Sequence, residues 1–173
     1  MPEGSGPVKH LFLRIPREGK GIADFRSAHD EVSRASGTVW IALAGRGLSR
    51  IRKEELTLQL QRRMTTYLYV VQMVKPGGVF EACRSKILEI ASSHSQIDIA
   101  LVPEYYTREG ITATGRCWIK ASSFENVKLR SLQSLRVAKS GKRAVDVLRR
   151  SMVFLMFVSE GEHSDSAAYS NEN

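Results

Sequence analysis

The segment TYLYVVQMV, Thr66–Val74, followed by KPGG, Lys75–Gly78, decides the fold class of this chain. It is rich in β-branched and aromatic residues, which suit a pleated and partly buried strand. The proline and glycines after it predict a turn. Beyond the turn, Val79–Ala91 is compatible with a helix, but its alternating apolar positions favour a strand that pairs back across the turn. We therefore expect a β-hairpin here.

Further strands and helices are expected on both sides of this hairpin. Alternation in Lys9–Ile15 predicts a strand with one buried face, and the apolar run Met152–Val158 predicts a central strand buried on both faces. The other expected strands are Thr38–Ala44, Gly115–Ala121 and Leu135–Ala138, and the expected helices are Gly21–Ala35, Glu54–Arg63 and Lys142–Arg150. Because these strands and helices do not strictly alternate, the pattern indicates an α+β fold. Short strands and glycine-rich turns favour a small, strongly curved mixed β-sheet or near-closed barrel with flanking helices.

The positive charge of the chain is unevenly distributed. The net charge is +8, but the last 15 residues contain four acidic residues and no Lys or Arg. The rest therefore has 26 basic against 14 acidic residues, a net charge of +12. Such an excess indicates a polyanionic partner, most often nucleic acid, although some basic proteins bind none.

The length of 173 residues fits one ordinary domain. We expect a flexible leader over residues 1–7, a single domain over residues 8–158 and a disordered acidic tail over residues 159–173. No apolar run approaches the roughly 18 residues of a membrane span, and the N-terminus lacks the apolar core of a secretory signal. Cys83 and Cys117 share no metal-ligand spacing, so we expect reduced thiols in a cytoplasmic protein without metal or cofactor.

Signals for catalysis are weak in this sequence. The glycines around Arg46 lack the spacing of a phosphate-binding P-loop, and no zinc-protease or serine-hydrolase motif is present. A metal-dependent nuclease needs clustered carboxylates, often with a lysine nearby. Asp98 and Glu104 are the best local pair, with Lys120 as the nearest downstream lysine. This nuclease alternative competes with a simpler interpretation, in which both acids lie in exposed turns.

Signals for nucleic-acid binding are stronger and concentrate in YYTREGITATGRCWIKASSF, Tyr105–Phe124. Aromatic rings stack on unpaired or flipped-out bases, while guanidinium and ammonium groups hold phosphates. The segment combines these two kinds of side chain, although each aromatic could equally be a core residue. Trp40 lies within an expected strand and is either a core residue or the wall of a pocket. Tyr67 lies on the same strand face as Tyr69.

The order of the motifs VWIALAGRGLS, TTYLYVV, VPEYY and CWIK resembles the EVE/YTH-like branch of the PUA superfamily. The resemblance covers roughly Val39–Val158. In particular it is similar to domains at the N-terminus of modification-dependent restriction and phage-defence proteins. It implies a strongly curved sheet or near-closed barrel in which an aromatic cage accepts one extruded, modified base.

The resemblance also implies roles for individual residues. The implied base-binding cage consists of Trp40, Tyr67, Tyr105, Tyr106, Trp118 and Phe124. The implied phosphate-binding residues are Arg46, Lys53, Arg108, Arg116 and Lys120. On this basis we expect a non-catalytic reader of nucleic acid, DNA rather than RNA, with a motor or nuclease supplied by another domain or subunit. A general nucleic-acid-binding domain without a base pocket and a protein-interaction domain remain alternatives.

Overall fold

The structure is a computed structural model that describes residues 6–15, 21–43, 47–75, 79–151 and 154–161. Arg46, most of the expected leader and most of the expected tail lie outside these ranges. The strands are β1 (His10–Arg14), β2 (Thr38–Ala42), β3 (Tyr67–Lys75), β4 (Val79–Ala91), β5 (Trp118–Ser122), β6 (Glu125–Asn126), β7 (Leu135–Val137) and β8 (Leu155–Glu160). The helices are α1 (Ile22–Ser36), α2 (Arg50–Gln61), α3 (Glu104–Arg108), α4 (Ile111–Thr114), α5 (Leu129–Ser134) and α6 (Ala144–Arg150), with short 3-10 turns at His94–Gln96 and Ile99–Leu101.

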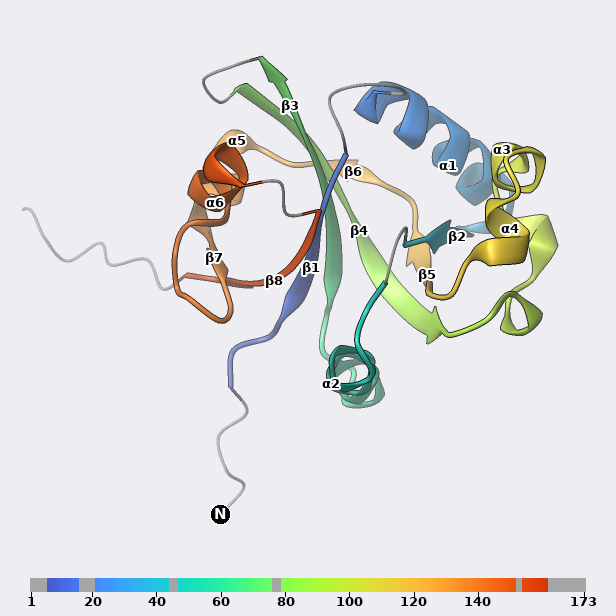
Figure 1. Cartoon of the computed structure of the whole chain (residues 1–173), viewed down its shortest axis with the longest axis horizontal. Helices are drawn as coiled ribbons and strands as arrows, with labels where there is room; N and C mark the ends of the chain where they lie inside the picture. The colour runs from blue at the N-terminus through green and yellow to red at the C-terminus, as the bar shows by residue number, and fades with distance from the viewer. Residues whose placement is uncertain (1–5, 16–20, 44–46, 76–78, 152–153, 162–173) are drawn as a thin grey trace, which may run out of the picture.

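The fold is α+β, as expected, and its strands form one mixed sheet of eight. Seven strands follow the order β2-β5-β4-β3-β1-β8-β7, and β6 pairs separately with β4. The β1–β3 pair is parallel, whereas the other described pairs are antiparallel. The expectation of a near-closed or strongly curved barrel is wrong, because β2 and β7 end the order without pairing to each other and the sheet is not strongly curled (Figure 1).

The expected hairpin is confirmed as β3 and β4. These strands pair antiparallel from Tyr67 opposite Lys86 to Met73 opposite Phe80, and Val79–Ala91 is a strand along its whole length. A second strand explains this result, because β4 also pairs with β5 through Ile87, Ile90 and Ala91. The strand pairing of β4 on both sides satisfies backbone groups that an isolated helix would have satisfied internally.

Both faces of the sheet are covered, which corrects the expectation for the first strand. In β1, Leu11 belongs to a core shared with α1, α2, β2 and β5, whereas Phe12 belongs to a second core with α5, α6 and β7. The side chains of Leu11 and Phe12 are 0% and 1% exposed. Because α1 lies on one side of β1 and α6 on the other, alternating residues are buried alternately on two sides (Figure 1).

The last strand is not central in the sheet. Only β7 lies outside β8 in the strand order. Met156, Phe157 and Val158 are buried, but Phe154 just before the strand is half exposed. The apolar run thus gives a strand next to the edge. No described helix is long and apolar enough to cross a membrane.

Helix α1 ends at Ser36, one residue beyond the expected end at Ala35. Gly37 has φ +80° and its amide donates to Ser33 O over 2.7 Å, a left-handed C-cap that glycine adopts without steric cost. Helix α2 begins at Arg50 rather than at the expected Glu54, because Ser49 supplies an N-cap: its side chain accepts from the Arg52 amide. Helix α1 contributes residues to the candidate site, whereas α2 packs against the core through Leu56.

Candidate functional site

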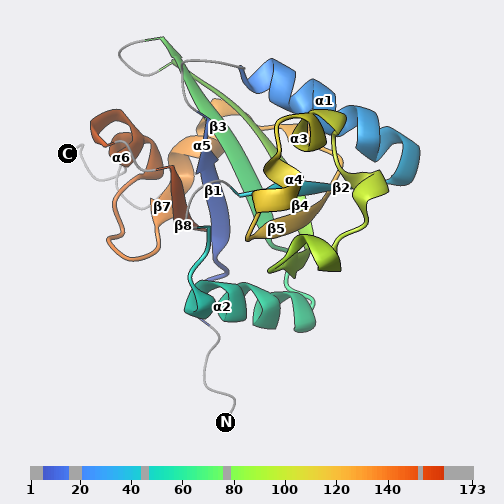
Figure 2. The same cartoon turned by 45° about the vertical axis from the view of Figure 1, so that its right-hand side comes forward.

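A cleft of about 1000 Å³ is lined by residues of α1, α3 and α4 and of the ends of β1 and β2. Figure 2 shows α1 beside α3 and α4, close to β2. Its apolar wall includes Phe25 from α1, Leu43 just after β2, and Tyr105 and Tyr106 from α3. Arg116, just before β5, lines the same cleft. The volume lies within the range of natural small-ligand pockets, roughly 300–1,000 Å³.

A buried polar pair fixes one wall of this cleft. His29 is 0% exposed; its Nδ1 lies 2.6 Å from Phe25 O and its Nε2 lies 2.9 Å from the Tyr106 hydroxyl. A carbonyl only accepts, so Nδ1 carries the proton and Nε2 accepts from Tyr106. Burial lowers the pKa of His29 to about 4 and raises the pKa of Tyr106 well above its ordinary value. Both groups are therefore neutral at pH 7.

Aromatic packing continues from this pair towards the cleft and into the core. Phe25 stacks on His29 with ring centroids 4.0 Å apart, and Tyr105 contacts Tyr106 edge-on at 4.5 Å. Trp118 contacts the other side of Tyr106 at 6.0 Å. Phe25 and Tyr105 are only partly buried, so their rings are the ones that can meet a ligand in the cleft.

The rim of the cleft is mixed in charge. Asp24, Glu31 and Glu109 line it together with Arg14 and Arg116. The Asp24 carboxylate accepts from the Gly21 amide, and Arg14 donates to backbone carbonyls. A nearly balanced rim around an apolar wall suits an uncharged planar group better than a free polyphosphate.

The structure gathers five of the six predicted cage aromatics around α1 and α3, but most of their surface is covered. Trp40 and Trp118 are 2% and 0% exposed, in one core cluster with Tyr106 and with Tyr105 packed against it. Phe124 is also buried, and it contacts Phe25 and His29 edge-on. These aromatics therefore form the support behind the cleft, and Tyr105 is the predicted residue with partly exposed ring surface there.

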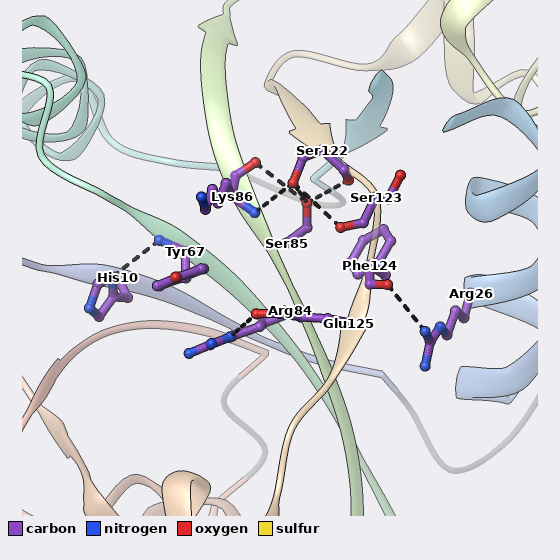
Figure 3. Close-up of polar contacts among 10 residues, drawn as sticks. All are labelled: His10, Arg26, Tyr67, Arg84, Ser85, Lys86, Ser122, Ser123, Phe124 and Glu125. Atoms are coloured by element: carbon purple, nitrogen blue, oxygen red, sulfur yellow. Dashed lines mark hydrogen bonds and ion pairs between the residues drawn. The ribbon is translucent and has the colours of Figure 1, made fainter. Parts of the chain in front are cut away.

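Tyr67, the sixth predicted aromatic, lies on the other side of the sheet. The Arg84 guanidinium lies 4.2 Å from its ring centroid, and Arg84 pairs with Glu125 at 2.5 Å. The Tyr67 amide donates to Nδ1 of His10, whose pKa is lowered chiefly by burial. Figure 3 shows the Tyr67 ring apart from that of Phe124, and Tyr67 does not line the cleft.

Of the predicted phosphate-binding residues, Arg116 alone lines the cleft among those that the structure describes. Lys120 pairs with Glu89 at 3.6 Å and lies over the Trp40 ring. Lys53 donates to Ser92 Oγ at 3.2 Å and approaches Arg116 O. Arg108 lines a smaller pocket between α1 and α3, and Arg46 lies outside the described residues.

The described residues contain no carboxylate cluster of the kind that the nuclease alternative requires to hold a metal ion. Asp98 caps a 3-10 turn by accepting from the Ala100 amide at 3.0 Å, and Glu104 is exposed at the start of α3. Lys120 is paired with Glu89 instead. Among the described residues, no group of three or more His, Cys, Asp or Glu side chains has an arrangement that could hold a metal ion.

Sequence reasoning missed Phe25, His29 and Arg14 as residues of this site. Phe25 and His29 lie within the expected helix Gly21–Ala35, and Arg14 lies within the expected strand Lys9–Ile15, but none of them was assigned to a site. The available signal was the position of His29 among apolar residues on one face of the expected helix, which indicates a buried side chain with a polar partner. Its partner, Tyr106, lies 77 residues away and could not be assigned from spacing.

Comparisons with known proteins give no further guide to this site. No family model, no curated protein and no solved structure matches the chain.

Proposed function

We propose that this chain is a non-catalytic nucleic-acid-binding module that accepts one extruded base, carrying a modification, in the cleft beside Phe25 and Tyr105. The convergence of separate motifs on one cleft supports this. The segment VWIALAGRGLS contributes Leu43, VPEYY contributes Tyr105 and Tyr106, and CWIK begins directly after Arg116. These are the motifs that resemble EVE/YTH-like domains, which read modified bases.

The proposed binding mode uses the two partly exposed rings. A base stacked on one aromatic ring gains about 1–3 kcal/mol, whereas extrusion from a duplex costs a few kcal/mol. Two rings, Phe25 and Tyr105, together with a phosphate contact from Arg116, are needed to offset that cost. The neutral His29–Tyr106 pair holds the wall behind them rigid, which lowers the entropy lost when the base enters.

Discrimination of the modification requires a second contribution. Burying one methyl group contributes roughly 0.8 kcal/mol, a preference of about four-fold. A larger preference requires that the unmodified base leave a polar group unpaired in the cleft. We propose DNA rather than RNA as the ligand, and a motor or nuclease in another domain or subunit as the effector.

The test is fluorescence-anisotropy binding to matched duplexes at two salt concentrations. The panel contains unmodified, N6-methyladenine, 5-methylcytosine and 5-hydroxymethylcytosine sites, plus single-stranded RNA. We expect one modified duplex to be preferred at both salt concentrations. Tyr105→Ala should lose about 1–3 kcal/mol of this binding, about 5- to 150-fold in Kd.

Tyr67→Ala is the matched control, because it removes a partly buried tyrosine on the other side of the sheet. It should leave the preference for the modified duplex intact. Equal effects of the two substitutions, or no preference among duplexes at any salt concentration, would refute a base site in this cleft.

The general nucleic-acid-binding alternative keeps one specific observation in its favour. Trp40, Trp118 and Phe124 are covered by other side chains and present little ring surface to a base. A protein that binds only through its basic surface should bind every duplex in the panel equally. Its affinity should also fall steeply with salt, because each phosphate contact releases counterions.

A further inference from the structure

The segment from Val127 to Ser151, which contains α5, β7 and α6, carries most of the net charge of the protein. It holds eight cations and a single acid, Asp146, a net charge of +7 compared with +8 for the whole chain. The cations are Lys128, Arg130, Arg136, Lys139, Lys142, Arg143, Arg149 and Arg150. We call them the α5–α6 basic surface. None of them is among the phosphate-binding residues that the motifs implied.

Structural pairing accounts for only two of these cations. Arg143 and Arg149 both contact Asp146, at 2.7 Å and 3.3 Å. The other six have no carboxylate partner among the described residues, and all but Arg136 are exposed. Exposed unpaired cations contribute little to folding, so their concentration here suggests another role.

The placement of several cations is unfavourable for the isolated protein. Arg136 lies directly opposite Arg143 in an isolated antiparallel bridge, where like charges repel. Lys128 and Arg143 lie at the N-caps of α5 and α6, the helix ends where acidic groups stabilise and cations do not. A bound polyanion would remove this repulsion, because it neutralises several cations at once.

An exposed turn carries two of these cations. The Gly141 amide donates to Val137 O over 2.8 Å, and Gly141 has φ +67°. Lys139 and Lys142 flank Ser140 and Gly141 in this exposed turn. Glycine adopts this left-handed backbone conformation without steric cost.

The basic surface lies on the opposite side of the sheet from the cleft but meets it at one point. Figure 1 shows α5, β7 and α6 on one side of β1 and β3, with α1, α3 and α4 on the other. Arg14 lines the cleft, and its Nη1 donates to Ser151 O at 2.6 Å, at the C-terminal end of α6. Arg150, exposed at the end of α6, immediately precedes Ser151. A strand leaving the cleft past Arg14 would therefore reach the basic surface.

We propose that the α5–α6 basic surface binds the phosphodiester backbone of the nucleic acid that flanks the base in the cleft. The identity of this ligand rests on the proposed function. Five of the eight cations are arginines, whose planar guanidinium suits bidentate contacts with phosphate. Membrane binding fits less well, because the apolar residues Ala144, Val145 and Leu148 of α6 are buried against the protein.

The test compares two double charge reversals. Lys139→Glu/Lys142→Glu changes the exposed turn of the basic surface, and Arg34→Glu/Arg62→Glu changes two exposed arginines on α1 and after α2. Both pairs alter the net charge equally, so general electrostatic attraction is matched. Binding of an unmodified duplex is measured by anisotropy over a series of salt concentrations, and thermal melting confirms that each variant folds.

Lys139→Glu/Lys142→Glu should weaken binding at least 10-fold more than the control pair. It should also reduce the slope of log K against log salt by about 1.8, since each phosphate contact contributes about 0.9. Equal affinities and slopes for the two pairs would overturn the proposal. A second outcome would also overturn it: the protein binds vesicles containing phosphatidylserine but no duplex, and Lys139→Glu/Lys142→Glu abolishes the vesicle binding.

The outcome of this experiment is independent of the outcome of the test of the cleft. Loss of modified-base preference in Tyr105→Ala, with an unchanged salt slope in Lys139→Glu/Lys142→Glu, would reject the backbone surface and keep the base site. A reduced slope in Lys139→Glu/Lys142→Glu, with no preference for any modified duplex in the unaltered protein, would reject the base site and keep the backbone surface.

Discussion

Acid should destabilise this protein through His29, the histidine buried behind the cleft. Burial lowers its folded-state pKa from 6.5 to about 4, so the unfolded chain binds more protons between these values. Stability is therefore at its full value above about pH 7.5 and falls as the pH drops towards 4. A shift of this size corresponds to about 3 kcal/mol, at about 1.4 kcal/mol per pKa unit. That is a large part of the usual 5–15 kcal/mol of a domain.

The assay is urea unfolding at intervals from pH 7.5 to pH 4, applied to the natural sequence and to His29→Gln. The difference between the two free energies of unfolding isolates His29, because carboxylates and His10 titrate in both proteins. This difference should shrink by about 3 kcal/mol as the pH falls. His94→Gln is the control, since His94 is exposed, and it should follow the natural sequence at every pH.

An NMR titration of the His29 ring gives the same pKa directly and does not require the variant to fold. A measured pKa of 6.5 or above would refute the burial argument. So would a difference in unfolding free energy that stays constant across the pH range. A pKa near 4 would also confirm that the ring is neutral when it accepts from the Tyr106 hydroxyl.

Three further predictions concern the core and its thiols. Gly115→Ala should lower the melting temperature, with a cost of about 1–3 kcal/mol, because its new Cβ would lie 2.6 Å from the buried Trp118 ring. Calorimetry should show a smaller loss of stability for Trp40→Phe than for Trp118→Phe. The indole nitrogen of Trp40 is buried without a partner among the described residues, whereas that of Trp118 donates to Gly115 O at 3.3 Å. Cys83 and Cys117 should react with a thiol reagent only after urea unfolds the chain, because both are buried and burial raises the pKa of Cys83 to about 12. Rapid modification of the folded protein would contradict the described packing.

The secondary structure was largely predictable because its signals are local. The β-branched and aromatic residues of Thr66–Val74, the turn after them and the alternation in Val79–Ala91 are neighbours in the sequence, and they predicted β3 and β4 correctly. The expected helix Gly21–Ala35 likewise agrees with α1 to within one residue at each end. The short helices α3, α4 and α5 were not predicted, because four to six residues are too few to show helical periodicity.

The aromatic residues of the site illustrate the opposite case. Their identity is visible in the sequence, but whether a ring is covered depends on elements far away in the chain. Trp118 is enclosed by Tyr106 and by the backbone of Gly115, and Trp40 by the same cluster. The family resemblance grouped Tyr67 with them, yet its strand face lies on the other side of the sheet.

The sequence by itself determined the α+β class, the hairpin of β3 and β4, and the excess of positive charge, because these depend on neighbouring residues or on simple composition. Only the tertiary structure decided that the sheet stays open, that both faces of β1 are buried, and that Phe25, His29 and Tyr106 form one wall. Each of these depends on contacts between segments separated by many residues. Local periodicity is nearly the same for a strand that faces solvent on one side and one that faces helices on both. The difference lies in which helices pack against it.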